Sequence, residues 1–439
     1  MKRTMITAAA ALLALAALQG RAAADGTPAA GDPTWAPSGK LLAGAANSAD
    51  APGMRPATAY RDTIGPGQTK FYALALDAKS SAYVSAFATP TMGSRVAYND
   101  GLELKLQSAD GSDCDSQSVH FGSDQDAHPV GTAVSRVIAP DASSCQEANA
   151  YTVRVTRVSD PASDPGIWPL ELRFVSEPGL RAGASPRPAP DFGSASPTPL
   201  IAGTPQQAHG GPSFETAAAV KTGIWKDRVA PGETRFYKVP VDWGQQATVF
   251  SDFSTAPVKD DTQYIGDGVR LGCYSPVRAL IDDSSHSYSG SAASLDYQTA
   301  PVAYANRTDD SEEVTMTSVA GWYYFAVTVH PDVSKAVSGP VPVTLRIDVK
   351  GTAQPAPAYV SDPGAAGIGL DAHDVSSADG GSHTASASGS SSSGTSGLRF
   401  VAFAAMGAGV VLLLTLAGWY GTARRRSRRT VDAVPPQGW

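Results

Sequence analysis

The sequence predicts an all-β protein made of two tandem β-sandwich domains, jelly-roll-like in their strand pattern, plus one C-terminal transmembrane helix. An 18-residue segment recurs later in the chain, apolar residues in both copies alternate with a period of two, and an uncharged run precedes a cluster of arginines. The predicted parts are 1–24 (signal peptide), 25–59 (N-terminal linker), 60–175 (first repeat), 176–213 (proline-rich linker), 214–350 (second repeat), 351–398 (stalk rich in Ser, Gly and Ala), 399–420 (transmembrane helix) and 421–439 (basic tail).

The N-terminus has the pattern of a secretory signal peptide. A basic start, Met1-Lys2-Arg3, precedes an uncharged apolar run over residues 5–18, and small residues follow at Ala22-Ala23-Ala24. The run of 14 residues is too short to span a hydrocarbon core of about 30 Å. We therefore expect cleavage before Asp25 and export of the chain.

Near the C-terminus, residues 400–419 form a run of 20 uncharged residues. At about 1.5 Å per residue, a helix of this length matches the apolar thickness of a bilayer. Five arginines follow between positions 424 and 429, and such clusters stay on the cytoplasmic side. We expect a single-pass type I protein of the cell membrane, with its N-terminus outside and its C-terminus in the cytoplasm.

The remaining ectodomain, residues 25–398, is acidic. It holds 34 − 3 − 6 = 25 basic and 41 − 1 = 40 acidic side chains, a net charge of −15, which argues against a nucleic-acid partner. The chain has three cysteines. Export permits a disulfide, and we predict one between Cys114 and Cys145, which leaves Cys273 in an apolar, strand-like run as a buried free thiol.

An internal duplication organises the ectodomain. Residues 60–77 and 225–242 align without a gap and share seven identical positions of 18, and shorter matches follow in the same order at an offset that drifts from 165 to 173. Each copy has a Pro-Gly turn followed by residues that alternate as in an antiparallel strand. The identical pairs are Asp62/Asp227, Pro66/Pro231, Gly67/Gly232, Thr69/Thr234, Phe71/Phe236, Tyr72/Tyr237 and Asp77/Asp242.

These residues carry a family resemblance. The loop ending in Pro-Gly-Gln/Glu-Thr-Lys/Arg-Phe-Tyr, the Asp-Gly at 100–101 and 267–268, and a late strand of the form aromatic-x-Val resemble bacterial pre-peptidase C-terminal domains. The second copy, from 214–227 to 241–246, is similar to the β-rich region that follows the von Willebrand A domain in actinobacterial membrane-anchored proteins. The resemblance implies a sandwich fold and an accessory role, and it transfers no catalytic residue.

Acidic and aromatic side chains of the ectodomain are the candidates for binding chemistry. Asp110, Asp113 and Asp115 could offer carboxylates to Ca²⁺, although the EF-hand spacing is absent and solvated turn residues are the alternative. Tyrosines of the strands could line a sugar-binding face, or else belong to the core: Tyr72, Tyr237, Tyr323 and Tyr324. The sequence shows no metalloprotease, nucleophile-elbow, phosphate-loop or dinucleotide motif in the ectodomain, so we predict no catalytic residue and no cofactor.

Duplication without a catalytic set favours a non-enzymatic module displayed at the bacterial cell surface, with an envelope protein or a cell-wall component as partner. One alternative is an accessory subunit of a membrane complex that contains a von Willebrand A domain protein. The other alternative is a hydrolase whose active site is assembled from distant residues. A pocket with clustered ionisable side chains would favour the hydrolase.

Overall fold

A computed structural model describes residues 35–371 and 374, except 123–126, 140–141, 143, 162, 191, 193–195 and 261–262. These residues belong to one compact unit. The predicted signal peptide, transmembrane helix and basic tail lie outside the described residues. No helix among the described residues is long and apolar enough to cross a membrane.

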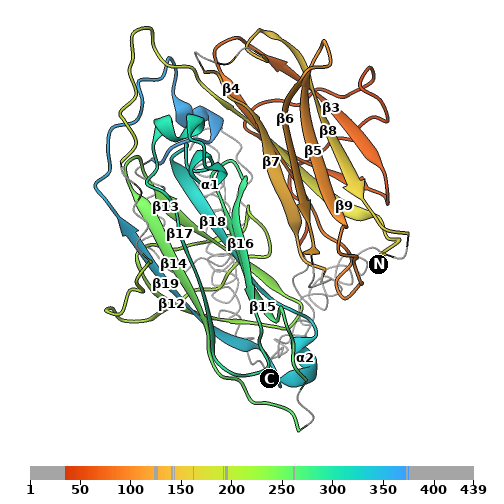
Figure 1. Cartoon of the computed structure of the whole chain (residues 1–439), viewed down its shortest axis with the longest axis vertical. Coiled ribbons are helices and arrows are strands. Elements are labelled where there is room, and N and C mark those ends of the chain that lie inside the picture. Colours follow the sequence, from red (N-terminus) through yellow and green to blue (C-terminus); the bar gives the residue numbers. More distant parts are fainter. Residues whose placement is uncertain are drawn as a thin grey trace, which may run out of the picture. The chain divides into compact units, whose positions relative to one another are not determined.

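The described residues form four β-sheets, which confirms the all-β prediction. Those of the first repeat are the β9 sheet (order β1-β2-β9-β4-β7) and the β8 sheet (order β3-β8-β5-β6), coloured from orange to yellow in Figure 1. The strands are β1 (Lys40–Leu41), β2 (Thr58–Ile64), β3 (Thr69–Leu76), β4 (Ser81–Ala88), β5 (Gly101–Ser108), β6 (Asp113–His120), β7 (Val130–Arg136), β8 (Asn149–Val158) and β9 (Trp168–Glu177).

The second repeat has the β19 sheet (order β10-β12-β19-β14-β17) and the β18 sheet (order β11-β13-β18-β15-β16). Its strands are β10 (Gln206–Gln207), β11 (Ala218–Ala219), β12 (Gly223–Val229), β13 (Thr234–Val241), β14 (Gln246–Phe253), β15 (Val269–Tyr274), β16 (Leu280–His286), β17 (Ala293–Gln298), β18 (Gly321–Val329) and β19 (Val341–Lys350). The short helices are η2 (Tyr304–Thr308), α1 (Glu312–Thr315), α2 (Val333–Ala336) and η3 (Pro363–Ala366).

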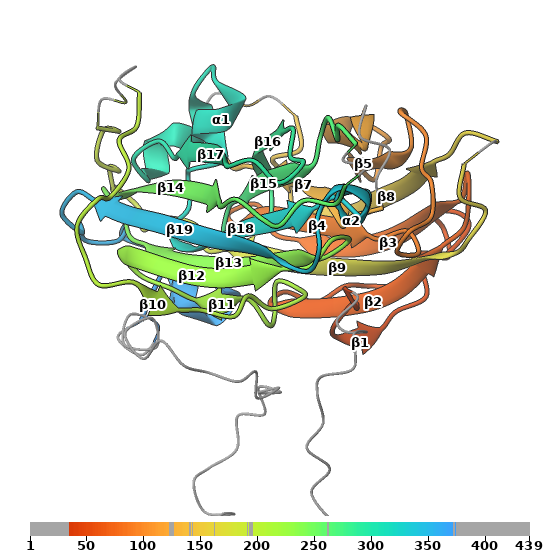
Figure 2. The same cartoon turned by 90° about the horizontal axis from the view of Figure 1, so that it is seen from below.

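Both repeats have the same topology. When the eight long strands of a repeat are numbered from β2 or β12, one sheet has the order 1-8-3-6 and the other has the order 2-7-4-5. This is the strand order of a jelly roll. Each repeat also has a short leading strand, β1 or β10, that pairs in parallel with β2 or β12 (Figure 2). The shared order is what a duplication predicts.

Two of the residues shared by the repeats, an aspartate and a tyrosine, make the same contacts in both. Tyr72 Oη donates to Asp62 Oδ2 at 2.8 Å, and Tyr237 Oη donates to Asp227 Oδ2 at 2.7 Å. The aspartate lies on one sheet and the tyrosine on the other, so the bond ties the two layers of each sandwich. The same carboxylate oxygen also accepts a backbone N–H from the preceding segment, that of Gly44 or Gly210 at 2.8 Å. These contacts give the sequence matches a structural reason.

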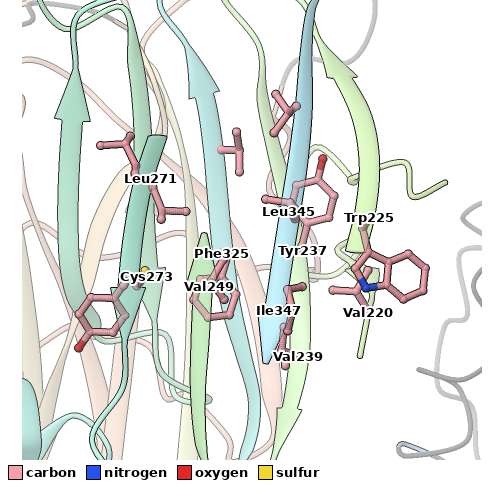
Figure 3. Close-up of a cluster of buried hydrophobic side chains, with 14 of the residues drawn as sticks. Val220, Trp225, Tyr237, Val239, Val249, Leu271, Cys273, Phe325, Leu345 and Ile347 are labelled. Carbon is pink, nitrogen blue, oxygen red and sulfur yellow. The ribbon is translucent and has the colours of Figure 1, made fainter. Parts of the chain in front are cut away.

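Each sandwich encloses its own core. In the second repeat, side chains from both sheets meet between the layers, and Trp225, Tyr237 and Phe325 are each at most 1% exposed (Figure 3). Cys273 lies in this core on β15 as a free thiol, as predicted. Burial raises the pKa of the Cys273 thiol well above its ordinary value.

The two sandwiches pack against each other. All eight residues of β4 are buried, although the side chains of a strand alternate between its two faces. One face of β4 lies in the core of the first repeat, and Tyr83 and Phe87 on the other face contact the second repeat. The Phe214 ring lies 4.7 Å from the Phe87 ring and 5.2 Å from the Tyr324 ring of β18. The outer faces of the β9 and β18 sheets therefore form a third apolar layer.

Charged groups are buried in the same interface. The Arg278 guanidinium, in the β15–β16 turn, pairs with Glu171 of β9, and both side chains are 1% exposed. It also pairs with Glu215, whose side chain is 46% exposed. Burial alone would lower the pKa of Arg278, but the two carboxylates outweigh it and raise the pKa. The sequence predicts two domains joined by a proline-rich linker, and these contacts show that the two domains also pack against each other.

Segments predicted as linker and stalk pack on the sandwiches. In the predicted N-terminal linker, Trp35 and Met54 are buried. The proline-rich segment pairs with the start of the predicted stalk, where Arg181 N donates to the carbonyl of Ala358 at 2.8 Å. Tyr359 and Ile368 are also buried, so the predicted stalk does not extend from residue 351. Isolated apolar side chains in low-complexity sequence supply the burial that holds these segments.

Candidate functional site

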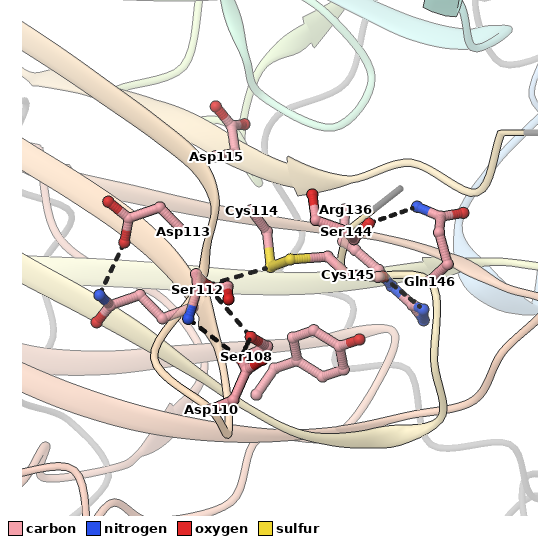
Figure 4. The surroundings of a disulfide bond; sticks show 12 residues. Ser108, Asp110, Ser112, Asp113, Cys114, Asp115, Arg136, Ser144, Cys145 and Gln146 are labelled. Carbon is pink, nitrogen blue, oxygen red and sulfur yellow. Dashed lines mark hydrogen bonds between the residues drawn. A yellow bond between two sulfur atoms is a disulfide. The ribbon is translucent and has the colours of Figure 1, made fainter. Parts of the chain in front are cut away.

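The predicted pairing of Cys114 and Cys145 is present as a disulfide (Figure 4). Cys114 lies on β6 and Cys145 lies in the connection from β7 to β8. The bond therefore ties this connection to the edge of the β8 sheet. Both cysteines line the cleft described below, so the disulfide holds one wall of that cleft.

The structure does not bring the three calcium candidates to one point. A bulge pairs Asp115 with Leu106 and Asp113 with Gln107, so the two carboxylates point to opposite sides of the sheet (Figure 4). Among the described residues, no three His, Cys, Asp or Glu side chains are arranged to hold a metal ion. Hydrogen bonds, from Ser108 to Asp110 and from Gln107 to Asp113, lower the pKa of both carboxyls.

Asp115 instead links the two edge strands of the first sandwich. Its Oδ2 accepts the backbone N–H of Ser135 on β7 at 2.7 Å and the Ser135 hydroxyl at 3.2 Å. Burial raises the pKa of the Asp115 carboxyl, and the Ser135 bonds only partly oppose this. The side chain has a structural role at the edge of the sandwich, and it also faces the cleft.

The candidate site is a cleft of about 530 Å³ between the repeats. The same connection of each repeat contributes to its walls: residues 137–148 join β7 to β8, and residues 299–320 join β17 to β18. Residues of β4, β6, β7 and the β15–β16 turn complete the lining. The second connection is longer and contains η2 and α1. Because the two repeats pack through different sheets, these two equivalent connections face each other across one opening.

An ion-paired cluster supports the floor of the cleft. Both terminal nitrogens of Arg307 donate to the carboxylate of Glu177 at 3.0 Å, and the hydroxyls of Tyr83 and Tyr359 donate to the same carboxylate. The guanidinium carbon lies 3.2 Å from the centre of the Tyr304 ring. Burial alone would lower the pKa of Arg307, but Glu177 outweighs it and raises the pKa. The charged groups of the cluster form hydrogen bonds with one another, so the cluster holds the floor of the cleft in place.

The rim of the cleft is acidic. Asp309, Asp310 and Glu312 line it from the η2–α1 segment and are exposed. Arg136 lies on the opposite wall, but its guanidinium donates to the backbone carbonyls of Asp77, Ser80 and Cys145. No histidine or free thiol is among the described residues that line the cleft. The groups available to a ligand are therefore carboxylates, hydroxyls and amides, which can bind by charge and hydrogen bonds.

The tyrosines that the sequence suggested for a sugar-binding face are buried. Tyr72, Tyr237 and Tyr323 are 0% exposed and Tyr324 is 7% exposed, so the core alternative is correct. The tyrosines that do face solvent are Tyr98, at 61%, and Tyr264, at 80%. Sequence reasoning passed over both. The signal that could have identified them is their position in a turn-rich segment, two residues before Asp100 and three residues before Asp267 of the repeated Asp-Gly pair.

Comparisons with known proteins add little. No family model matches the chain, and no curated protein matches it. Among solved structures, an uncharacterised protein from Burkholderia cenocepacia is 10% identical over 65% of this chain and 76% of that chain, with a TM-score of 0.18. The N-terminal CBM22-1-CBM22-2 tandem domain from Paenibacillus barcinonensis Xyn10C is 11% identical over 65% of this chain and 83% of that chain, with a TM-score of 0.17. Likenesses this distant support no statement about function.

Proposed function

We propose that the protein is a non-enzymatic binding module of the bacterial cell surface, anchored by residues 399–420 and directed outward. The observation that carries the proposal is the cleft, which both repeats build with the same connection and whose rim is acidic. A ligand held there contacts both repeats at once. The resemblance of the repeats to pre-peptidase C-terminal domains agrees with a binding or accessory role.

The packing of the repeats supports binding over catalysis. The ionisable groups at the floor of the cleft are engaged with one another, as Arg307 is with Glu177. A catalytic pair needs a nucleophile within reach of a base that can take its proton, and Ser135 with Asp115 is such a pair among the described residues that line the cleft. Asp115 also accepts the backbone N–H of Ser135, so this carboxylate closes the sandwich edge. The acidic rim favours ligands that carry positive charge or many hydrogen-bond donors.

The test is binding of the purified full chain to isolated cell envelope, measured by co-sedimentation. We expect the neutralised variant Asp309→Asn/Asp310→Asn/Glu312→Gln to bind about tenfold more weakly, because it removes charge that faces the ligand. Asp296→Asn is the matched control, since Asp296 is an exposed acid on β17 outside the cleft. Unchanged binding of the triple variant would contradict the proposal.

Co-purification distinguishes the proposed display role from the alternative role as an accessory subunit. If the protein belongs to a membrane complex with a von Willebrand A domain protein, detergent extracts should yield that partner in fixed ratio with the full chain. Binding to protein-free cell-wall material would instead favour the display role. Turnover of a chromogenic ester or peptide by the full chain would favour the hydrolase.

A further inference from the structure

Exposed apolar side chains gather at one end of the described unit. Nine large apolar side chains are more than a third exposed among the described residues, and five of them lie in connections between particular strands. Four belong to the β4–β5 or β14–β15 connections of the two repeats, and one belongs to the β8–β9 connection. The five are Met92, Tyr98, Ile167, Val258 and Tyr264.

Strand pairing places these connections at the end opposite to the cleft. Ala88, the last residue of β4, pairs with Val130, the first residue of β7. The β4–β5 connection therefore leaves the sheet at one end, and the β7–β8 connection that lines the cleft leaves at the other. The same pairing occurs in the second repeat, where Phe253 of β14 pairs with Ala293 of β17. This surface is thus separate from the proposed cleft.

The two repeats contribute to this end together. A Cβ built on Gly232, in the β12–β13 turn, would lie 3.7 Å from the Met92 sulfur of the β4–β5 connection. Strands β12 and β14 are both antiparallel to β19, so the β12–β13 and β14–β15 connections leave the second sandwich at the same end. The loops that carry Tyr98 and Tyr264 are therefore on the same side of the unit.

Backbone hydrogen bonds hold the described residues at or next to both tyrosines. Gly122 N donates to the Tyr98 carbonyl at 3.0 Å, and Tyr288 N donates at 3.1 Å to the carbonyl of Ile265, which follows Tyr264. The Asp100 carboxylate also accepts the N–H of Ala97 at 3.1 Å. Because the backbone beside each ring is already hydrogen-bonded, a ligand that stacks on the ring has less backbone to order, which favours binding.

We infer that Tyr98 and Tyr264 form a bipartite stacking platform for a neutral polysaccharide. A sugar ring has an apolar face of C–H groups, and the rings of Tyr98 and Tyr264, 61% and 80% exposed, can stack against such a face. The net charge of −15 in the ectodomain disfavours anionic polymers such as phosphate-linked glycans. Two platforms on one unit fit a repeating chain, because the second contact becomes intramolecular.

The experiment is affinity electrophoresis of the full chain in native gels that contain hydroxyethyl cellulose or glucomannan. We expect at least one of these polymers to retard the wild-type chain. Tyr98→Ala and Tyr264→Ala should each weaken retention about tenfold, and the double variant should abolish it, because each ring contributes a stacking contact. The Tyr98→Phe/Tyr264→Phe variant keeps both rings and should be retained like the wild type.

Ile201→Ala is the matched control. Ile201 is 84% exposed and lies in the segment of the chain that connects β9 to β10, outside these loops. It should leave retention unchanged. Absence of retardation by both polymers, or full retention of the double alanine variant, would overturn the inference. If the wild type still bound isolated envelope in that case, this inference alone would fail and the proposed function would stand.

Discussion

Replacement of Arg278 by Met tests whether the buried ion pair joins the two repeats. The variant keeps apolar volume beside Phe214, whose ring lies 4.8 Å from the Arg278 guanidinium carbon, but it removes the positive charge. Glu171 then stays 1% exposed, with only the backbone N–H and hydroxyl of Ser38 as hydrogen-bond donors. Breaking a buried pair on one side costs about 3–5 kcal/mol, so we expect a loss of that size.

The free energy of unfolding from urea titration of the full chain measures this loss. Two variants complete the test. Glu215→Gln should cost less than about 1 kcal/mol, because its side chain is 46% exposed and water replaces the pair. Adding Glu171→Gln to Arg278→Met should recover about 2 kcal/mol, since no uncompensated charge remains buried.

Amide exchange provides a second readout of the interface. If Arg278→Met loosens the contact between the repeats, protection should fall first in β4 and β18, whose outer faces meet there. A cost below about 1 kcal/mol for Arg278→Met, or an equal cost for Glu215→Gln, would refute the reasoning that the buried charge pair stabilises the interface.

Three further predictions follow from single contacts. Tyr72→Phe and Tyr237→Phe should each lower the free energy of unfolding by about 1.5–3 kcal/mol, and by similar amounts, because each loses one hydrogen bond to a buried carboxylate; urea titration checks the equality. Reduction of the Cys114–Cys145 disulfide, which spans a sequence separation of 31, should cost about 4 kcal/mol, measured by unfolding with and without a phosphine reductant. Because burial raises the pKa of Asp115, its contribution favours folding below the unfolded pKa of about 3.9 and is lost as pH rises. Asp115→Asn should therefore gain stability relative to the wild type as the pH rises above about 4, and a gain that shrinks with rising pH would contradict this.

Local patterns in the sequence predicted the strands well. Alternation of apolar residues and the Pro-Gly turns depend on neighbours along the chain, and in both repeats the glycine of that turn has a positive φ, 65° at Gly67 and 84° at Gly232. The disulfide was predicted because only two cysteines lie in loop-rich sequence. The calcium candidates failed because a single bulge at Cys114 reverses the direction of one carboxylate, and spacing along the chain does not show a bulge.

By itself, the sequence determined the all-β class and the duplication. The strands follow from alternation between neighbouring residues, and the duplication follows from matching segments in the same order along the chain. Tertiary structure alone decided how the repeats meet. Tyr83 and Phe87 look like ordinary outward positions of a strand, and Arg278 like a surface charge. They are buried because the outer face of the β18 sheet, in the second repeat, packs against the outer face of the β9 sheet, in the first repeat. The cleft and the exposed tyrosines follow from that packing, because it brings together loops that are more than 100 residues apart in sequence.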